Sequence, residues 1–175
     1  MRFEQPLTTR RAFLFGCAAG LLAPAARASH LTVGAPAPAT TLVTLDGRTI
    51  STGDLLGRVV VVTFWATYCS PCRTELPLLS QFATAHAPEG LTVLGFSADG
   101  EESLADVGRI ARDLSFPVGL LSRSRADGYG RIWRLPVSFT IDRTGVLASD
   151  GWRDRDPVLT AARLDALVVP LLRSG

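Results

Sequence analysis

Apolar residues run almost without interruption from Val59 to Ala66 and again from Leu91 to Ala98. Short runs rich in β-branched side chains are typical of strands buried on both faces of a sheet. A third segment, Val137 to Ile141, alternates apolar and polar residues with a period of two. It leads through a turn at residues 142–145 into Val146 to Trp152, so two successive strands are expected here.

Helical periodicity follows the first buried strand. Leu76, Leu79 and Ala83 share one face with Cys72, on a helix that begins near Ser70. The proline at position 71 suits a first helical turn. Three further helices are expected over residues 101–114, over 123–132, and from Asp156 as N-cap with Pro157 to about Leu172.

A hairpin is expected before the first buried strand, because residues 42–45 and 48–50 flank an Asp46-Gly47 turn. The order of elements predicts an α/β fold, with a mixed central sheet flanked by helices on both faces and an N-terminal β-hairpin extension. Residues 29–40, rich in Ala and Pro, are expected to form a flexible lead-in arm, and residues 41–175 the folded domain.

Residues 1–28 predict a cleaved export signal of the twin-arginine type. Arg10-Arg11 ends a basic region, a mild apolar stretch runs from Ala12 to Ala23, and residues 26–28 form an A-x-A cleavage site. The apolar stretch is shorter than the roughly 20 residues of a membrane-spanning helix. A retained membrane anchor, or a lipoprotein modified at Cys17, is the less favoured alternative.

The composition excludes several classes of protein. The chain has 175 residues, enough for one domain, and its 47% apolar and 19% charged residues exclude a disordered chain. The formal charge of +2 falls to −1 once residues 1–28 are removed, since 14 basic and 15 acidic residues remain. A nucleic-acid or anionic-membrane surface therefore has no electrostatic support.

Removal of the signal leaves one cysteine pair, Cys69 and Cys72. Cys69 falls at the predicted helix N-terminus, where free N–H groups and the helix dipole favour a thiolate and lower the pKa of its thiol. Cys72 falls on the apolar face and is expected to be shielded. An exposed thiolate that attacks and a sheltered thiol that resolves are what disulfide exchange requires.

Two other uses of the pair are less favoured. A zinc site needs about four ligands, and only His30 and His86 could join the cysteines. An inert structural disulfide would not need a helix start beside it, and so short a loop gains little stability from closure. We therefore expect no metal and no cofactor.

The mature chain resembles the TlpA/ResA-like thiol–disulfide oxidoreductases of the thioredoxin superfamily, over residues 33–172. The resemblance rests on Trp65 to Cys72, on the C-x-x-E-x-P continuation from Cys72 to Pro77, and on Leu135 to Asp142, which matches the family's cis-proline loop and strand. It implies a thioredoxin-like fold.

The resemblance also implies roles for individual residues. Pro136 would be cis and face the cysteines, and the backbone of Leu135 would bind an extended substrate by strand addition. Trp65 and Tyr68 would flank the pair as substrate-binding residues. Glu75, an acid on the apolar face, would move a proton to or from Cys72.

The reaction is expected to run toward reduction of client disulfides. Ser70-Pro71, between the cysteines, offers no histidine to stabilise the thiolate, which favours a reducing couple. The export signal predicts a periplasmic location, and a membrane thiol donor of the DsbD/CcdA type is expected to keep the protein reduced. The resemblance suggests clients in cytochrome c or copper-centre maturation. A monomer is expected.

Two alternatives remain. A peroxiredoxin-type peroxidase needs P-x-x-x-T-x-x-C, but Val62 and Ala66 stand at the first two positions relative to Cys69. Relative to Cys72, those positions hold Trp65 and Cys69. A copper-binding redox chaperone would use the two thiolates as ligands, and copper retention by the reduced protein would reveal it.

Overall fold

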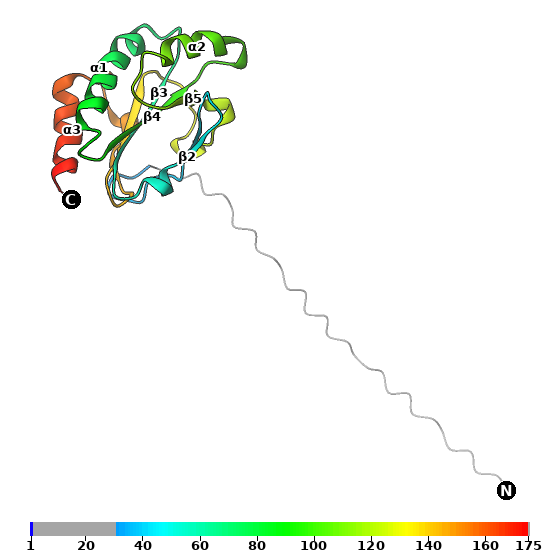
Figure 1. Ribbon diagram of the computed structural model, residues 1–175. Helices are drawn as coiled ribbons and strands as arrows, with labels where there is room; N and C mark the ends of the chain where they lie inside the picture. Colours follow the sequence, from blue (N-terminus) through cyan, green and yellow to red (C-terminus); the bar gives the residue numbers. More distant parts are fainter. Residues whose placement is uncertain (2–30, 175) are drawn as a thin grey trace.

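The computed structural model describes Met1 and residues 31–174 (Figure 1). A mixed five-stranded sheet with the strand order β5-β4-β3-β6-β7 forms its centre. β3 is parallel to β4 and antiparallel to β6, which confirms the predicted mixed sheet. The strands are β3 (Val59–Trp65), β4 (Leu91–Ser97), β5 (Val118–Leu120), β6 (Val137–Ile141) and β7 (Leu147–Ser149).

The α-helices are α1 (Ser70–His86), α2 (Leu104–Ala111) and α3 (Ala161–Arg173). Figure 1 shows α1 and α3 side by side against the sheet. Apolar residues of all three helices belong to one core cluster, together with Val59, Val61 and Trp65 of β3. The prediction of α-helices on both faces is therefore wrong for the described residues.

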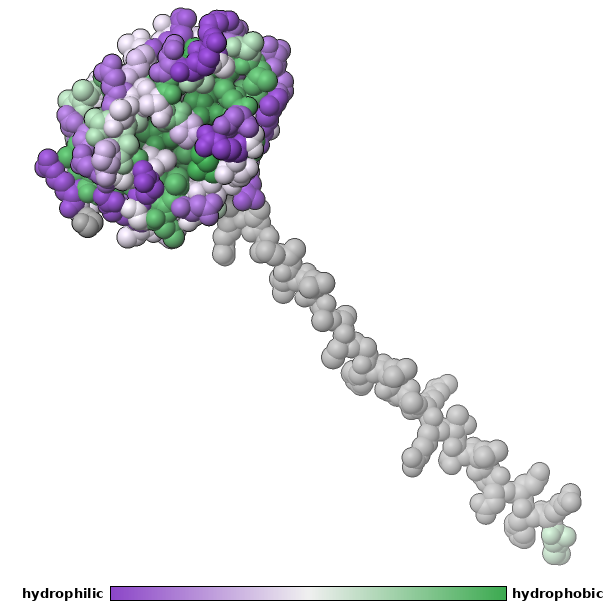
Figure 2. All heavy atoms as spheres, viewed as in Figure 1, coloured by the Kyte–Doolittle hydropathy of each residue, from purple (hydrophilic) through white to green (hydrophobic). Residues whose placement is uncertain are grey.

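The second face of the sheet carries an aromatic core. Phe64, Phe96, Tyr129 and Phe139 meet there with ring centroids 4.5–6.0 Å apart. The hairpin of β1 (Thr41–Val43) and β2 (Thr49–Ser51) confirms the predicted extension, and its Leu42 joins this core. On the face drawn in Figure 2, apolar residues reach the surface between hydrophilic ones.

Two predicted helices differ from the structure. The segment 101–114 divides into a 3-10 turn, Glu101–Ser103, and the shorter α2. No α-helix forms over 123–132, which holds the end of the 3-10 turn Leu121–Arg123 and then the 3-10 turn Asp127–Tyr129. Gly130 ends that turn with a φ of +79°, a left-handed conformation that continues no α-helix.

The last helix begins later than predicted. Its N-cap is Thr160, whose hydroxyl accepts a hydrogen bond from the backbone N–H of Arg163 at 3.3 Å. Residues 157–160 are not helical. The backbone N–H of Leu159 instead donates to the carboxylate of Glu75, a tertiary contact that the local Asp156-Pro157 signal does not reveal.

The predicted lead-in arm is not free chain along its whole length. The backbone N–H groups of Gly34 and Ala37 donate to the carbonyls of Leu147 and Gly145, and Leu147 donates to Ala35. This part of the arm lies against the edge of the sheet. The predicted signal, residues 1–28, lies almost wholly outside the described residues, and no helix within the described part is long and apolar enough to cross a membrane.

Candidate active site

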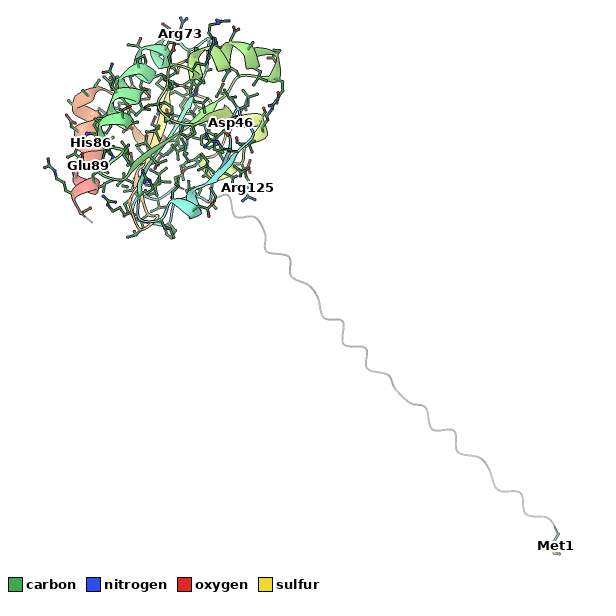
Figure 3. The ribbon with its side chains drawn as sticks, in the orientation of Figure 1. Met1, Asp46, Arg73, His86, Glu89 and Arg125 are labelled. Atoms are coloured by element: carbon green, nitrogen blue, oxygen red, sulfur yellow. A yellow bond between two sulfur atoms is a disulfide. The ribbon has the colours of Figure 1, made fainter. Side chains whose placement is uncertain are left out.

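Cys69 and Cys72 form a disulfide at the point where β3 gives way to α1. The two sulfurs are 2.00 Å apart and the two Cα atoms 5.3 Å apart. Cys69 is the N-cap of α1, and its Sγ accepts a hydrogen bond from the backbone N–H of Cys72 at 3.3 Å. In Figure 3, Arg73 marks this end of α1, while His86 lies at the other. The sulfur of Cys69 therefore faces the free N–H groups that favour an anion.

The two cysteines differ in exposure, although less than the sequence suggests. Cys69 is 8% exposed and Cys72 is 1% exposed. Cys69 lines a hollow of about 500 Å³, whose other walls are Tyr68, Ser70, Pro71, Ala98, Ile132, Trp133 and Leu135. Cys72 belongs to the hydrophobic core. A reagent in the hollow can thus reach Cys69 but not Cys72.

The loop before β6 forms the opposite wall of the hollow. The Leu135–Pro136 peptide bond is cis, in agreement with the resemblance. Leu135 is half-buried, lies in the hollow and packs against both core clusters. The geometry therefore brings the cysteine pair and the proline loop together at one site.

The two predicted aromatic neighbours have opposite surroundings. Tyr68 is 73% exposed and lines the hollow, so it can contact a bound polypeptide. Trp65 is fully buried among core residues of the helix-covered face. The prediction that Trp65 binds substrate is wrong, because this last residue of β3 has no exposed surface that a substrate could contact.

Glu75 is buried in α1, one turn after Cys72. Its side chain is inaccessible at 2% exposure, and its Oε2 accepts a hydrogen bond from the backbone N–H of Leu159 at 2.7 Å. Burial raises its pKa from the ordinary value of 4.5 to about 7, although the bond from Leu159 and the positive charge of Arg163 oppose the rise. Residues three apart on a helix face are neighbours, so this carboxyl group lies on the side of Cys72.

Arg163 is held in place by the segment before α3. Its guanidinium forms an ion pair with Asp154 and also donates to the backbone carbonyl of Asp156. Arg134, next to the cis-proline loop, donates to the carbonyls of Gly151 and Asp154 at 2.7 and 3.0 Å. The segment before α3 therefore contacts both Arg163, whose charge acts on Glu75, and Arg134, which lies next to the cis-proline loop.

Asp99 is a buried carboxylate that the sequence analysis missed. It is 5% exposed and accepts hydrogen bonds from the Thr67 N–H at 2.9 Å, the Thr67 hydroxyl at 2.6 Å and the Ser97 hydroxyl at 2.6 Å. These bonds tie the loop before Cys69 to the end of β4. A signal for it exists, because Thr67 and Asp99 each directly follow a predicted buried strand, and β3 and β4 pair in parallel register.

Comparison with known proteins agrees with this geometry. Residues 33–149 match the AhpC/TSA family. The chain belongs to the AhpC/TSA family. Among curated relatives of this chain, the thiol-disulfide oxidoreductase ResA of Bacillus cereus is 31% identical over 113 residues, which cover 65% of each chain. The thioredoxin-like protein YneN of Bacillus subtilis is 31% identical over 116 residues, 65% of this chain and 68% of the relative. The matched part thus spans just under two thirds of the ResA relative.

Solved structures show the same fold. A thiol:disulfide interchange protein DsbE from Chlorobium tepidum aligns with a TM-score of 0.66 and 26% identity, covering 82% of this chain and 99% of that one. A thioredoxin family protein from Chlorobium tepidum TLS has a TM-score of 0.66 and 28% identity over the same shares. The thioredoxin-like α/β fold with its N-terminal hairpin is confirmed.

This member of the AhpC/TSA family has a C-x-x-C pair, Cys69 and Cys72. The positions that a peroxiredoxin-type motif would fill relative to Cys69 hold Val62, buried in β3, and Ala66. Neither side chain has a hydroxyl to offer a peroxide. Among the residues that the structure describes, no group of three or more His, Cys, Asp or Glu side chains gathers as metal ligands would.

Proposed function

We propose that this chain is an extracytoplasmic thiol–disulfide oxidoreductase that reduces disulfides in client proteins. The observation that carries the proposal is the Cys69–Cys72 disulfide at the start of α1, open on one side to the hollow beneath the cis Leu135–Pro136 bond. The names of the ResA and DsbE relatives point to the same chemistry.

The reduced protein would act through two exchanges. The Cys69 thiolate attacks one sulfur of the client disulfide, forms a mixed disulfide, and releases the other client sulfur as a thiolate that takes up a proton. Cys72 then attacks the sulfur of Cys69, restores the Cys69–Cys72 bond and releases the second client thiolate. Two electrons pass from the dithiol to the client. The N–H groups at the start of α1 stabilise the charge on Cys69.

Glu75 would accept the proton that Cys72 loses on attack. A thiol in the core needs a base within the protein, because Cys72 is 1% exposed and water does not reach it. Burial raises the pKa of Glu75 to about 7, so the carboxyl group can hold or release a proton near neutral pH. The same group can return that proton when a donor reduces the disulfide again.

Client binding would use the walls of the hollow. The backbone of Leu135 would pair with an extended client segment, and the exposed ring of Tyr68 would pack on it. The cysteine of the client then lies opposite Cys69. Pro136 would hold this loop in the conformation that faces the disulfide.

The setting of the reaction follows from the sequence. We propose export to the periplasm by a twin-arginine-type signal over residues 1–28, and reduction by a membrane thiol donor of the DsbD/CcdA type. Ser70-Pro71 supports the reducing direction, since no histidine stabilises the thiolate of Cys69. Clients in cytochrome c or copper-centre maturation fit this role, and the protein would act as a monomer.

Trapping tests the proposal. In Cys72→Ser the mixed disulfide with the client has no resolving thiol, so it should accumulate and be visible by non-reducing electrophoresis in the exporting cell. Cys69→Ser is the matched control and should trap little. Equal trapping by both variants would contradict the assigned roles. Peroxide consumption by the reduced protein would favour a peroxidase, and stoichiometric copper retention would favour a chaperone.

A further inference from the structure

A second hollow lies next to the one that holds Cys69. It measures about 500 Å³, and its walls are Leu31, Thr32, Tyr129, Gly130, Arg131, Trp133, Asp150, Trp152 and Arg153. Trp133 lines both hollows. A polypeptide that places its cysteine over Cys69 can therefore continue across this indole into the second hollow.

Trp133 is exposed but held in place. The residue is 69% exposed, and its ring stacks on that of Trp152 with 5.4 Å between ring centroids and 12° between planes. The indole N–H of Trp152 donates to the carbonyl of Tyr129 at 2.8 Å. The guanidinium of Arg134 lies 5.4 Å from the Trp133 ring and 5.9 Å from that of Trp152.

A rigid exposed aromatic ring is a strong feature for binding. Trp and Arg are enriched among the few residues that supply most of the affinity at protein interfaces. A ring already fixed by its neighbours loses little conformational entropy when a partner covers it. Both indoles and Arg134 are fixed here before any partner arrives, so Trp133 offers a flat apolar platform.

The charges around the second hollow are unequal. Arg131 and Arg153 face it together with one acid, Asp150. Asp150 is buried, accepts from the backbone N–H of Trp152 and pairs with Arg153 at 3.4 Å. Arg131 is exposed and takes part in none of the ion pairs among the described residues. The hollow therefore favours an occupant with a carboxylate.

We infer that the second hollow is a specificity subsite for the client polypeptide, in which Trp133 packs on an aromatic side chain and Arg131 pairs with an acidic one. The inference rests on the proposed function. Because Trp133 lines both hollows, these two side chains belong within a few residues of the reacting cysteine. Clients are thus selected by an aromatic–acidic pair beside the cysteine as well as by the disulfide.

Peptides with one cysteine, blocked as a mixed disulfide with thionitrobenzoate, test the inference. One set has two peptides, with Phe three residues and Glu four residues from the cysteine, placed before the cysteine in one peptide and after it in the other. The matched set carries Ala and Gln at the same positions. We expect the fully reduced protein to react about tenfold faster with the better Phe/Glu peptide than with its Ala/Gln partner, which corresponds to about 1.4 kcal/mol. The rate of each reaction is measured from the release of thionitrobenzoate.

Variants assign the preference to the hollow. Trp133→Ala should lower the ratio of the two rates to the part that Arg131 contributes, and Trp133→Phe should restore part of the loss. Arg131→Ser should lower the ratio to the part that Trp133 contributes. Leu56→Ala is the control. It truncates an exposed apolar side chain that lines neither hollow, so it should leave the ratio unchanged.

The outcomes separate the two proposals. Equal rates for both peptide sets in the wild-type protein, or a ratio that neither Trp133→Ala nor Arg131→Ser lowers, would overturn the subsite while disulfide exchange still stands. Failure of the reduced wild-type protein to react with any of the peptides would instead overturn the proposed function.

Discussion

Two buried carboxylates flank the active-site loop in contrasting surroundings. Asp99, on the β4 side, is 5% exposed and accepts three hydrogen bonds from Thr67 and Ser97. Glu75, on the α1 side, is 2% exposed and accepts one bond, from Leu159. A buried charge costs little when donors surround it and much when they do not. Asp99 therefore suits a structural hydrogen-bond acceptor, whereas Glu75 suits a group that exchanges protons.

The two carboxylates therefore have different expected roles on the two sides of the active-site loop. The bonds of Asp99 fix the backbone that leads to Cys69, the proposed attacking residue. Glu75, whose pKa is raised to about 7, lies on the side of Cys72, the proposed resolving residue. Loss of Asp99 should therefore mainly lower the stability of the protein. Loss of Glu75 should change how stability depends on pH and should slow the attack of Cys72 on the mixed disulfide.

The largest expected effect is that of Asp99→Ala on stability. A buried donor on Ser97 and two part-buried donors on Thr67 lose their acceptor, and an unpaired buried group costs about 1–3 kcal/mol. We expect the free energy of unfolding to fall by about 4 kcal/mol in urea titrations of the oxidised protein. Asp113→Ala, at an exposed site, is the control. A loss below about 1 kcal/mol would show that the carboxylate is not a structural anchor.

Glu75→Gln should change how stability depends on pH. The folded protein keeps the proton on Glu75 between pH 4.5 and about 7, where the unfolded chain has lost it. The folded state therefore binds more protons in this window, and wild-type stability falls as the pH rises through it. The expected loss is about 3 kcal/mol.

Gln carries no such proton, so the free-energy difference between variant and wild type should shift in favour of the variant by this amount from pH 4.5 to 8. Urea titrations at both pH values measure the shift. A difference that stays constant with pH would mean that Glu75 titrates normally and is no proton store.

Glu75→Gln should also slow the second exchange. Without a base beside it, Cys72 loses its proton poorly, so resolution of the mixed disulfide should be about 10²-fold slower at pH 7. The first attack by Cys69 should change little. Stopped-flow measurements with a disulfide peptide resolve the two steps, and Glu102→Gln, an exposed acid, serves as the control. Equal slowing of both steps would point to general distortion instead.

The smallest expected effect is that of Thr67→Val. The substitution removes the hydroxyl that donates to Asp99 Oδ1 but keeps the backbone N–H that donates to Oδ2. We expect a loss of about 1–2 kcal/mol in the free energy of unfolding. Thr74→Val, at an exposed position of α1, should change stability by less than about 0.5 kcal/mol. A loss of stability in Thr74→Val as large as that in Thr67→Val would show that the bond from Thr67 to Asp99 has no special weight.

Local signals in the sequence were sufficient for the centre of the fold. A continuous β-branched run predicts β3, and the helix signals at Ser70 and Pro71 place Cys69 at an N-cap. The cis bond before Pro136 came from the family resemblance, because no local pattern distinguishes cis from trans.

The errors arise where tertiary contacts override local patterns. Asp156-Pro157 is a good helix start, but the N–H of Leu159 is engaged by Glu75, and α3 begins at Ala161. The helix expected over 123–132 does not form, and Gly130 ends the short 3-10 turn Asp127–Tyr129 instead. Asp99 was missed because its partners come from two strands that only the folded sheet brings together.

The central claim is that Cys69, and not Cys72, is the reactive thiol. Alkylation by iodoacetamide at pH 7 tests it in the reduced single-cysteine variants Cys72→Ser and Cys69→Ser. The account predicts that Cys69, in Cys72→Ser, is modified at least about tenfold faster, because it faces the hollow and caps α1. Faster modification of Cys72 in Cys69→Ser would contradict it.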